Sequence, residues 1–169
     1  MKLDLVPISK NIAVKSFDCG NGILNEYLKL YSRKNDTERI GRTFLALDED
    51  GTVAGYITLS NAQVERNKLP EALKLPRYPI PALRIGKLAV DKTMQGKGLG
   101  SWLLFKSFEQ VMRIAELSAV YVMIVDAIDS NAGNFYLKYG FVPLQDSELS
   151  LFLPVKTIAA EFYDKLFDE

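Results

Sequence analysis

The fold is decided by the stretch Val90–Leu104, which reads VDKTMQGKGLGSWLL. Three glycines, Gly96, Gly98 and Gly100, alternate with other residues here, after the apolar run ALRIGKLAVD. That run predicts a strand, and the apolar spacing after the glycines predicts a long helix that reaches Ala115. Because a helix start has unpaired N–H groups and partial positive charge, the turn between them is a candidate anion-binding loop.

The spacing of the glycines separates three kinds of phosphate loop. A Walker loop needs Ser or Thr after the lysine, and here a glycine follows Lys97. A dinucleotide fingerprint needs a third glycine where this chain has Ser101 or Leu103. The pattern Q/R-x-x-G-x-G/A fits Gln95–Gly100, and in this respect the loop resembles the pyrophosphate loop of the GNAT N-acetyltransferases. The alternative is a glycine-rich turn that binds no ligand.

The other elements are predicted from periodicity and turn residues. In the first half they are a strand at 3–8, a helix capped by Asn21, a hairpin at 42–60 with its turn at 48–51, and a loop at 65–81 with at most one helical turn. The helix after Asn21 has Leu24, Tyr27, Leu28 and Tyr31 on one face. In the second half they are a buried strand at 119–128, a short helix at 130–140 capped by Ser130 and stopped by Gly140, one or two strands at 141–155 and a helical tail at 156–169. Strands first form a meander and then alternate with helices. This order predicts an α/β domain of the α+β kind, with a largely antiparallel sheet and one βαβ unit.

Composition limits the chemistry and the location. The 169 residues suit one domain, 1–169, and no apolar run is long enough to cross a membrane. The chain has no histidine and a single cysteine, Cys19, so we expect no metal site and no disulfide. No secretory segment is recognisable at the N-terminus, which favours the cytoplasm.

Charge is distributed unevenly although the net charge is zero. The first hundred residues carry 16 Lys and Arg against 11 Asp and Glu, and the remainder carries 5 against 10. Two basic stretches, 29–42 and 66–77, contribute to the excess. They are consistent with an ordinary solvated surface or with a face that binds an anionic partner.

The chain resembles the GNAT superfamily over most of its length. The resemblance implies a mixed, mostly antiparallel sheet with a splayed central strand pair and flanking helices, and acetyl-CoA as cosubstrate. It implies that the backbone of Leu88–Val90 contacts the pantetheine arm and that amides of Gly96–Ser101 hold the pyrophosphate. The expected cofactor-binding residues are Leu88, Ala89, Val90, Gln95, Gly96, Lys97, Gly98, Leu99, Gly100, Ser101, Asn131 and Phe135.

The segment NAGNFYLKYGF is similar to the family's A-x-x-F/L-Y-x-K-x-G-F segment. By this resemblance Tyr136 is the catalytic acid that protonates the departing thiolate, and a phenol is protonated at neutral pH. The alternative is that Tyr136 only packs on the sheet. The family often has Asn where this chain has Asp129, and Asn131 is near that place but out of register.

The general base is not evident from the sequence. Some family members use a Glu on the strand before the loop, and here that strand carries Arg84 and Lys87 but no acid. A backbone N–H of Leu88 or Ala89 would polarise the thioester carbonyl. Either a distant carboxylate acts through water or the acceptor amine has a low pKa.

A narrower resemblance concerns the acetyltransferase toxins of bacterial toxin–antitoxin pairs. They share a C-G-N-x-x-L-N-x-[WYF]-L helix start, which Cys19–Leu28 matches, and a basic residue followed by L-A-V, which Lys87–Val90 matches. This resemblance implies acetylation of the amine of aminoacyl-tRNA, an antitoxin partner and a homodimer. Two alternatives remain: an acceptor amine on a small molecule or protein, and a CoA-binding module without catalysis. The tail, with apolar residues at Ile158, Phe162 and Leu166, could pack on its own domain or on a second subunit.

Overall fold

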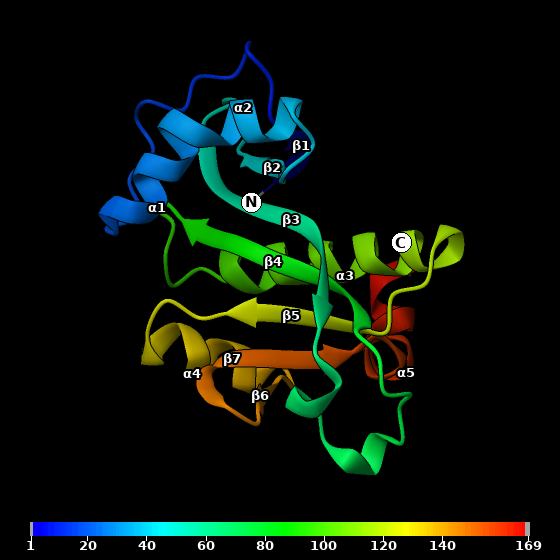
Figure 1. Cartoon of the computed structure of the whole chain (residues 1–169). Coiled ribbons are helices and arrows are strands. Elements are labelled where there is room, and N and C mark those ends of the chain that lie inside the picture. Colours follow the sequence, from blue (N-terminus) through cyan, green and yellow to red (C-terminus); the bar gives the residue numbers. More distant parts are fainter. Residues whose placement is uncertain (1, 168–169) are drawn as a thin grey trace. The chain divides into compact units, whose positions relative to one another are not determined.

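A computed structural model describes the backbone of residues 2–167 and the side chains of residues 2–162. Seven strands within this range form one sheet in the order β1-β2-β3-β4-β5-β7-β6 (Figure 1). Their bounds are β1 Asp4–Pro7, β2 Arg42–Leu47, β3 Val53–Val64, β4 Ile80–Val90, β5 Val122–Asp126, β6 Val142–Leu144 and β7 Ser147–Pro154. The α-helices are α1 Gly22–Glu26, α2 Ser32–Thr37, α3 Leu99–Leu117, α4 Ser130–Lys138 and α5 Val155–Phe167.

The sheet is mixed, as the sequence predicts. The pairs β1–β2, β2–β3, β5–β7 and β6–β7 are antiparallel, and β4–β5 is parallel. Because α3 lies between β4 and β5 in the chain, these elements form the predicted βαβ unit. The β4–β5 register covers Ala82–Ile85 and ends there, although β4 continues to Val90. This early end of the pairing is what a splayed strand pair requires.

The chain divides into two compact units. The first consists of residues 1–60 and 86–107, and the second of residues 61–85 and 108–169. Both β3 and β4 contribute to each unit, so the two units share strands rather than a linker. That residues 1–169 form a single domain stays a prediction.

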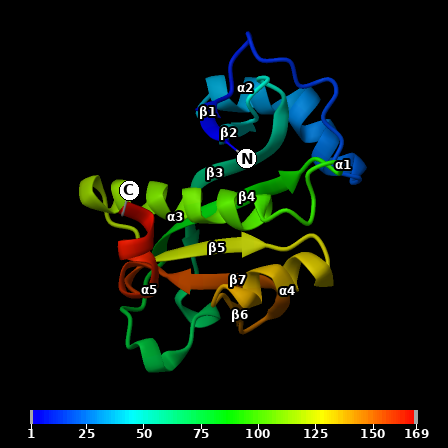
Figure 2. The same ribbon diagram turned by 180° about the vertical axis from the view of Figure 1, so that it is seen from behind.

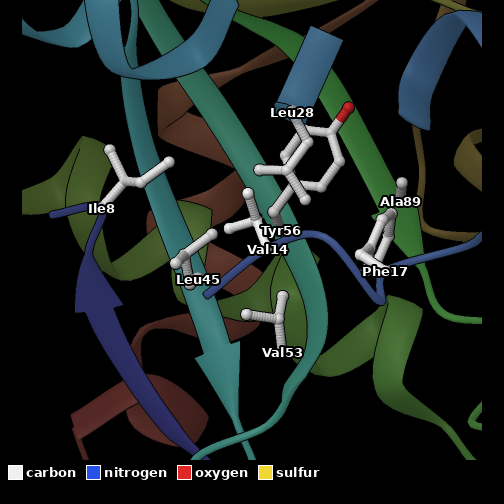
Figure 3. Close-up of a cluster of buried hydrophobic side chains, with 8 residues drawn as sticks. All are labelled: Ile8, Val14, Phe17, Leu28, Leu45, Val53, Tyr56 and Ala89. Atoms are coloured by element: carbon white, nitrogen blue, oxygen red, sulfur yellow. The ribbon is translucent and has the colours of Figure 1, made fainter. Parts of the chain in front are cut away.

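The core of the first unit lies around Tyr56 (Figure 3). The Tyr56 ring is fully buried, and the Phe17 ring meets it edge-on with centroids 5.5 Å apart. Ala89, near the end of β4, belongs to the same cluster. Burial of these apolar side chains fixes the end of β4 against the N-terminal segment.

The helical segment after Asn21 contains a wide turn that the sequence does not predict. Asn21 caps α1 as expected, by accepting from the N–H of Leu24. A π-helical turn, Tyr27–Tyr31, then separates α1 from α2. The extra residue in this turn shifts the apolar face predicted for Leu24, Tyr27, Leu28 and Tyr31. Tyr31 is therefore exposed, and Ser32 takes the buried position.

In the second unit β5 is buried along Val122–Val125, as predicted for a strand covered on both faces. Two expectations for neighbouring segments are corrected. The segment 65–81 forms two 3-10 turns, Arg66–Lys68 and Glu71–Leu73, and its end belongs to β4. Helix α4 is capped by Asp129 and not by Ser130, because the Asp129 carboxylate accepts from the N–H of Ala132 at 2.8 Å.

The C-terminal helix α5 packs within the second unit. Ile158 is fully buried, and the Phe162 ring lies 5.1 Å from the Phe108 ring. Leu166 lies outside the described side chains. Among the described residues, no helix is long and apolar enough to cross a membrane, and no group of three metal-ligating side chains is found.

Candidate functional site

The glycine loop lies between the end of β4 and the start of α3, as predicted. Gly96 and Gly98 have φ of 77° and 84°, which is left-handed backbone that disfavours other residues. Helix α3 starts at Leu99, and the N–H of Trp102 donates to the Gly98 carbonyl. The amides just before Trp102 therefore have no acceptor within the helix. Residues 95–98 are exposed, so these donors are accessible to an anion.

The side chain of Gln95 fixes this loop from within. Its Nε2 donates to the carbonyl of Val90 and to the carbonyl of Cys19, each at 2.9 Å. Val90 is the last residue of β4, and Cys19 lies before α1. One amide thus joins the strand end, the loop and the segment that leads into α1.

A second set of hydrogen bonds joins the same two segments through Asp18. The Asp18 Oδ1 accepts from the N–H of Gly20 and from Nδ2 of Asn25, each at 2.9 Å. Its Oδ2 lies 3.0 Å from Nζ of Lys92, and its N–H donates to Asp91 Oδ2 at 3.0 Å. The Gly20 N–H, Lys92 and Asn25 hold the pKa of Asp18 well below its usual range.

Asp91 is the first residue after β4, and its carboxylate accepts the hydrogen bond from the Asp18 N–H. Burial raises its pKa, but hydrogen bonds from the Thr93 hydroxyl and from the N–H groups of Asp18 and Thr93 more than offset that effect. The resulting pKa of Asp91 lies below its ordinary value. Both Asp18 and Asp91 are thus carboxylates that accept hydrogen bonds and hold the base of the loop in place.

The last residues of β4 precede this base. Ala89 is buried in the core of the first unit, whereas Leu88 and Val90 are partly exposed. Gly55 on β3 allows this arrangement, because a Cβ there would lie 2.9 Å from the Ala89 carbonyl oxygen. The strand end thus packs closely against β3 and against the cluster around Tyr56.

The predicted acid, Tyr136, lies on α4 in the second unit. Figure 2 shows α4 beside β7, and a Cβ at Gly133 would meet the Leu149 side chain at 3.5 Å, which is an ordinary van der Waals contact. The Tyr136 ring packs edge-on against the rings of Phe135 and Phe141, with centroids 5.1 and 5.4 Å away. The side chain is 5% exposed.

The hydroxyl of Tyr136 is suited to donate a hydrogen bond. Among the described residues no partner for it is found, and every fully enclosed side-chain oxygen or nitrogen there has one. Burial raises the pKa of Tyr136, so the phenol stays protonated at neutral pH and above.

The predicted site residues fall into two groups. Leu88, Ala89, Val90 and the loop Gln95–Ser101, with Lys97 exposed in it, lie together in the first unit. Asn131, Phe135 and Tyr136 lie together on α4 in the second unit. Asp129 caps α4, which accounts for an acid at a place where the family often has Asn.

Sequence reasoning missed the contacts between the segment 18–25 and the loop. The signal was present in the letters DCGNGILN, since Asp18 and Asn25 are short polar residues that bond to backbone groups in turns. Asn25 bonds locally to Asp18 and Cys19, but Asp18 also contacts Asp91 and Lys92, far along the chain, so spacing alone could not identify those partners. The sequence also gave no indication that the Lys87 ammonium lies over the Tyr27 ring, 4.6 Å from its centroid.

The basic stretches are partly occupied by local contacts. Arg33 donates to the carbonyls of Ser9 and Ile12, and Arg42 pairs with Asp36 at 2.9 Å. Arg66 donates to carbonyls of the loop that it starts, and Lys68 pairs with Asp146. Such residues hold turns together, and only part of the formal positive charge remains for a partner.

Comparison with known proteins identifies the chain. The model of the acetyltransferase (GNAT) domain matches residues 40–143. The chain belongs to the GNAT acetyltransferase family. This acetyltransferase is similar to a tRNA-acetylating toxin of Mycobacterium tuberculosis, with 30% identity over 149 residues that cover 87% of the chain and 89% of the toxin. It is thus an acetyl-CoA-dependent N-acetyltransferase.

Two solved structures extend the comparison. AtaT complexed with acetyl-methionyl-tRNAfMet superposes with a TM-score of 0.88 at 28% identity, and covers 95% of the acetyltransferase and 99% of that chain. A mutant of the toxin AtaT, bound to the C-terminus of the antitoxin AtaR and to acetyl-CoA, superposes with a TM-score of 0.82 at 27% identity, over 95% and 98%. The likeness therefore extends over nearly the whole of both chains.

Proposed function

We propose that this acetyltransferase transfers the acetyl group of acetyl-CoA to the α-amine of an aminoacyl-tRNA. The observation that carries the proposal is the full-length likeness to AtaT complexed with acetyl-methionyl-tRNAfMet. The sequence C-G-N-x-x-L-N-x-Y-L at Cys19–Leu28 supports it independently. In this structure that segment is bonded to the glycine loop through Gln95 and Asp18.

The glycine loop is where the pyrophosphate of acetyl-CoA would bind. Positive φ at Gly96 and Gly98, exposed amides and the start of α3 together fit an anion. Lys97 would add a cationic contact, and the backbone of Leu88 and Val90 would pair with the pantetheine amides. When bound, acetyl-CoA supplies the acetyl thioester for the reaction.

Groups of the chain then act on the carbonyl oxygen and on the sulfur of the thioester. A backbone N–H of Leu88 or Ala89 donates to the acetyl carbonyl oxygen and stabilises the negative charge that develops there. The amine nitrogen forms the new C–N bond as the C–S bond breaks. The Tyr136 hydroxyl donates its proton to the departing sulfur, and the amine releases one proton to solvent.

A strong base is not needed for this acceptor. The α-amine of an amino-acid ester is less basic than a lysine side chain, so a larger share of it is neutral near pH 7. The strand before the loop carries no acid that could serve as base, and Arg84 on it pairs with Asp126. An acceptor of low pKa is consistent with that strand.

The test is transfer of labelled acetyl from acetyl-CoA to two pools in parallel. One pool is bulk charged tRNA, and the other is a mixture of polyamines, free amino acids and lysine-containing peptides. The proposal requires label in charged tRNA and none in the same tRNA after deacylation. Label only in the second pool would assign a small-molecule or protein acceptor, and acetyl-CoA binding without any transfer would assign a binding module.

Three accompanying proposals concern a partner protein, the oligomeric state and the place of action. We expect an antitoxin partner, since AtaT is found bound to the C-terminus of AtaR. We also expect a homodimer, which sedimentation at several concentrations would test. The place of action is the cytoplasm, because charged tRNA is the substrate.

A further inference from the structure

Lys87 has a cationic side chain whose charge is not paired with an acid. It lies on β4, directly before Leu88, and its ammonium is 4.6 Å from the centroid of the Tyr27 ring. Among the described residues no carboxylate oxygen lies within 4.0 Å of its Nζ. A cation over an aromatic ring at a half-exposed site is weakly held, so the ammonium can move to a stronger anionic partner.

The Tyr27 ring is a fixed platform for this ammonium. It stacks on the Tyr56 ring, with centroids 6.5 Å apart and planes 18° apart. The Tyr56 hydroxyl in turn donates to the Leu24 carbonyl at 2.7 Å. Tyr27 also begins the π-helical turn, a distortion that is frequent at functional sites.

The position along β4 places Lys87 next to the groups that act on the acetyl carbonyl. Side chains two apart on a strand share a face and lie roughly 7 Å apart. Ala89 packs in the cluster around Tyr56 (Figure 3), and Tyr27 packs against the same cluster. Lys87 therefore points to the side of β4 that α1 and the π turn occupy, one residue from the Leu88 backbone.

We propose that Lys87 binds the phosphate of the acceptor that is nearest to the reacting amine, and so selects acceptors whose amine is borne on a nucleotide. The inference rests on the proposed function, because an aminoacyl-tRNA has a phosphodiester one nucleoside away from its amine. On binding, the ammonium leaves the Tyr27 ring and pairs with the phosphate oxygens. Lys87 is thereby a specificity-determining residue, and it takes no part in the bond changes.

Two minimal acceptors that differ only in the phosphate test this role. They are 3′-aminoacyl-adenosine and the same compound with a 5′-phosphate, and kcat/KM is measured for each. The wild-type chain should prefer the phosphorylated acceptor by about tenfold or more, as expected for one charge-assisted contact. Lys87→Met should abolish the preference, change kcat/KM for the unphosphorylated acceptor by less than about threefold and leave acetyl-CoA affinity unchanged.

Two further variants serve as controls. Lys87→Arg keeps the charge and should keep the preference. Lys106→Met removes another lysine whose ammonium lies near an aromatic ring, 5.5 Å from the centroid of the Trp102 ring, and it should behave like the wild type. Unchanged calorimetric binding of acetyl-CoA to Lys87→Met reports that the variant is folded.

The outcomes separate the inference from the proposed function. A preference that persists in Lys87→Met, or an equal loss of kcat/KM for both acceptors, overturns the inference. If charged tRNA is acetylated but the wild type shows no preference for the phosphate, the inference fails and the proposed function stands. If the wild type acetylates neither the minimal acceptors nor charged tRNA, both fail.

Discussion

The substitution Gly55→Ala tests how the end of β4 is held. The added Cβ would lie 2.9 Å from the Ala89 carbonyl oxygen and 3.0 Å from Cδ1 of Leu103. The first contact is with backbone, which cannot rotate away, so β3 or β4 must shift. Since Ala89 directly precedes Val90, the shift would reach the glycine loop.

The size of the effect follows from two opposing contributions. Overpacking of this kind costs about 1–3 kcal/mol of unfolding free energy. Replacing a strand glycine by alanine recovers about 0.5–1 kcal/mol by restricting the unfolded chain. We expect a net loss of about 1–2 kcal/mol. For a chain of this length that corresponds to a fall in Tm of roughly 2–8 °C.

Gly86→Ala is the matched control on the neighbouring strand. A Cβ at Gly86 would meet nothing closer than the Thr58 carbonyl oxygen at 3.8 Å, which is an ordinary contact. Calorimetric melting should show this variant as stable as the wild type or more so. If Gly55→Ala melts at the same temperature as Gly86→Ala, the described approach of β3 and β4 is wrong.

Three further predictions concern the site. In Gln95→Leu two hydrogen bonds are lost, so we expect acetyl-CoA to bind at least fivefold more weakly by calorimetry. The control is Gln63→Leu, at an exposed position of β3. Unchanged affinity of Gln95→Leu would show that the Gln95 contacts do not order the loop. Because the pKa of Asp18 is lowered in the folded chain, its stabilisation is present above the unfolded pKa of about 3.9 and is lost as the pH falls below it. The urea midpoint of Asp18→Asn should therefore be lower than that of the wild type at pH 7, and it should fall less than the wild-type midpoint between pH 5 and pH 2. Midpoints that change in parallel with pH in the two proteins would refute this. Because burial raises the pKa of Tyr136, kcat/KM should rise with pH as the acceptor amine loses its proton, with no decline at any pH up to 10. Tyr136→Phe should lower kcat about 100-fold or more. A decline of kcat/KM with an apparent pKa at or below 10, or full activity of the variant, would remove Tyr136 as the acid.

Local signals account for the parts of the fold that the sequence predicts. Gly96 and Gly98 indicate a turn that other residues would strain, and the strand before them and the helix after them are confirmed. The hairpin of β2 and β3 follows from alternation around the turn at Asp48–Gly51. In each case the elements are neighbours in the chain, so spacing carries the information.

The remaining features depend on contacts between distant segments. The residues of the π turn at Tyr27–Tyr31 are compatible with an ordinary α-helix. What sets this turn apart from an α-helix is the packing of Tyr27 on Tyr56 and the burial of Ser32. Serine is a frequent helix cap, which favours Ser130 at the start of α4, but aspartate is equally suited and Asp129 takes the place. The roles of Asp18 and Lys87 arise from partners that no periodicity connects to them.

Acetylation of the aminoacyl amine is tested most directly by locating the transferred acetyl group on the product. Charged tRNA is incubated with the chain and labelled acetyl-CoA, digested with nuclease, and the released 3′ nucleoside is analysed by mass spectrometry. We expect N-acetyl-aminoacyl-adenosine as the labelled product, and we expect it to be absent when the tRNA is deacylated beforehand. Label on a nucleobase, or label that enters only polyamines or lysine-containing peptides, would contradict it.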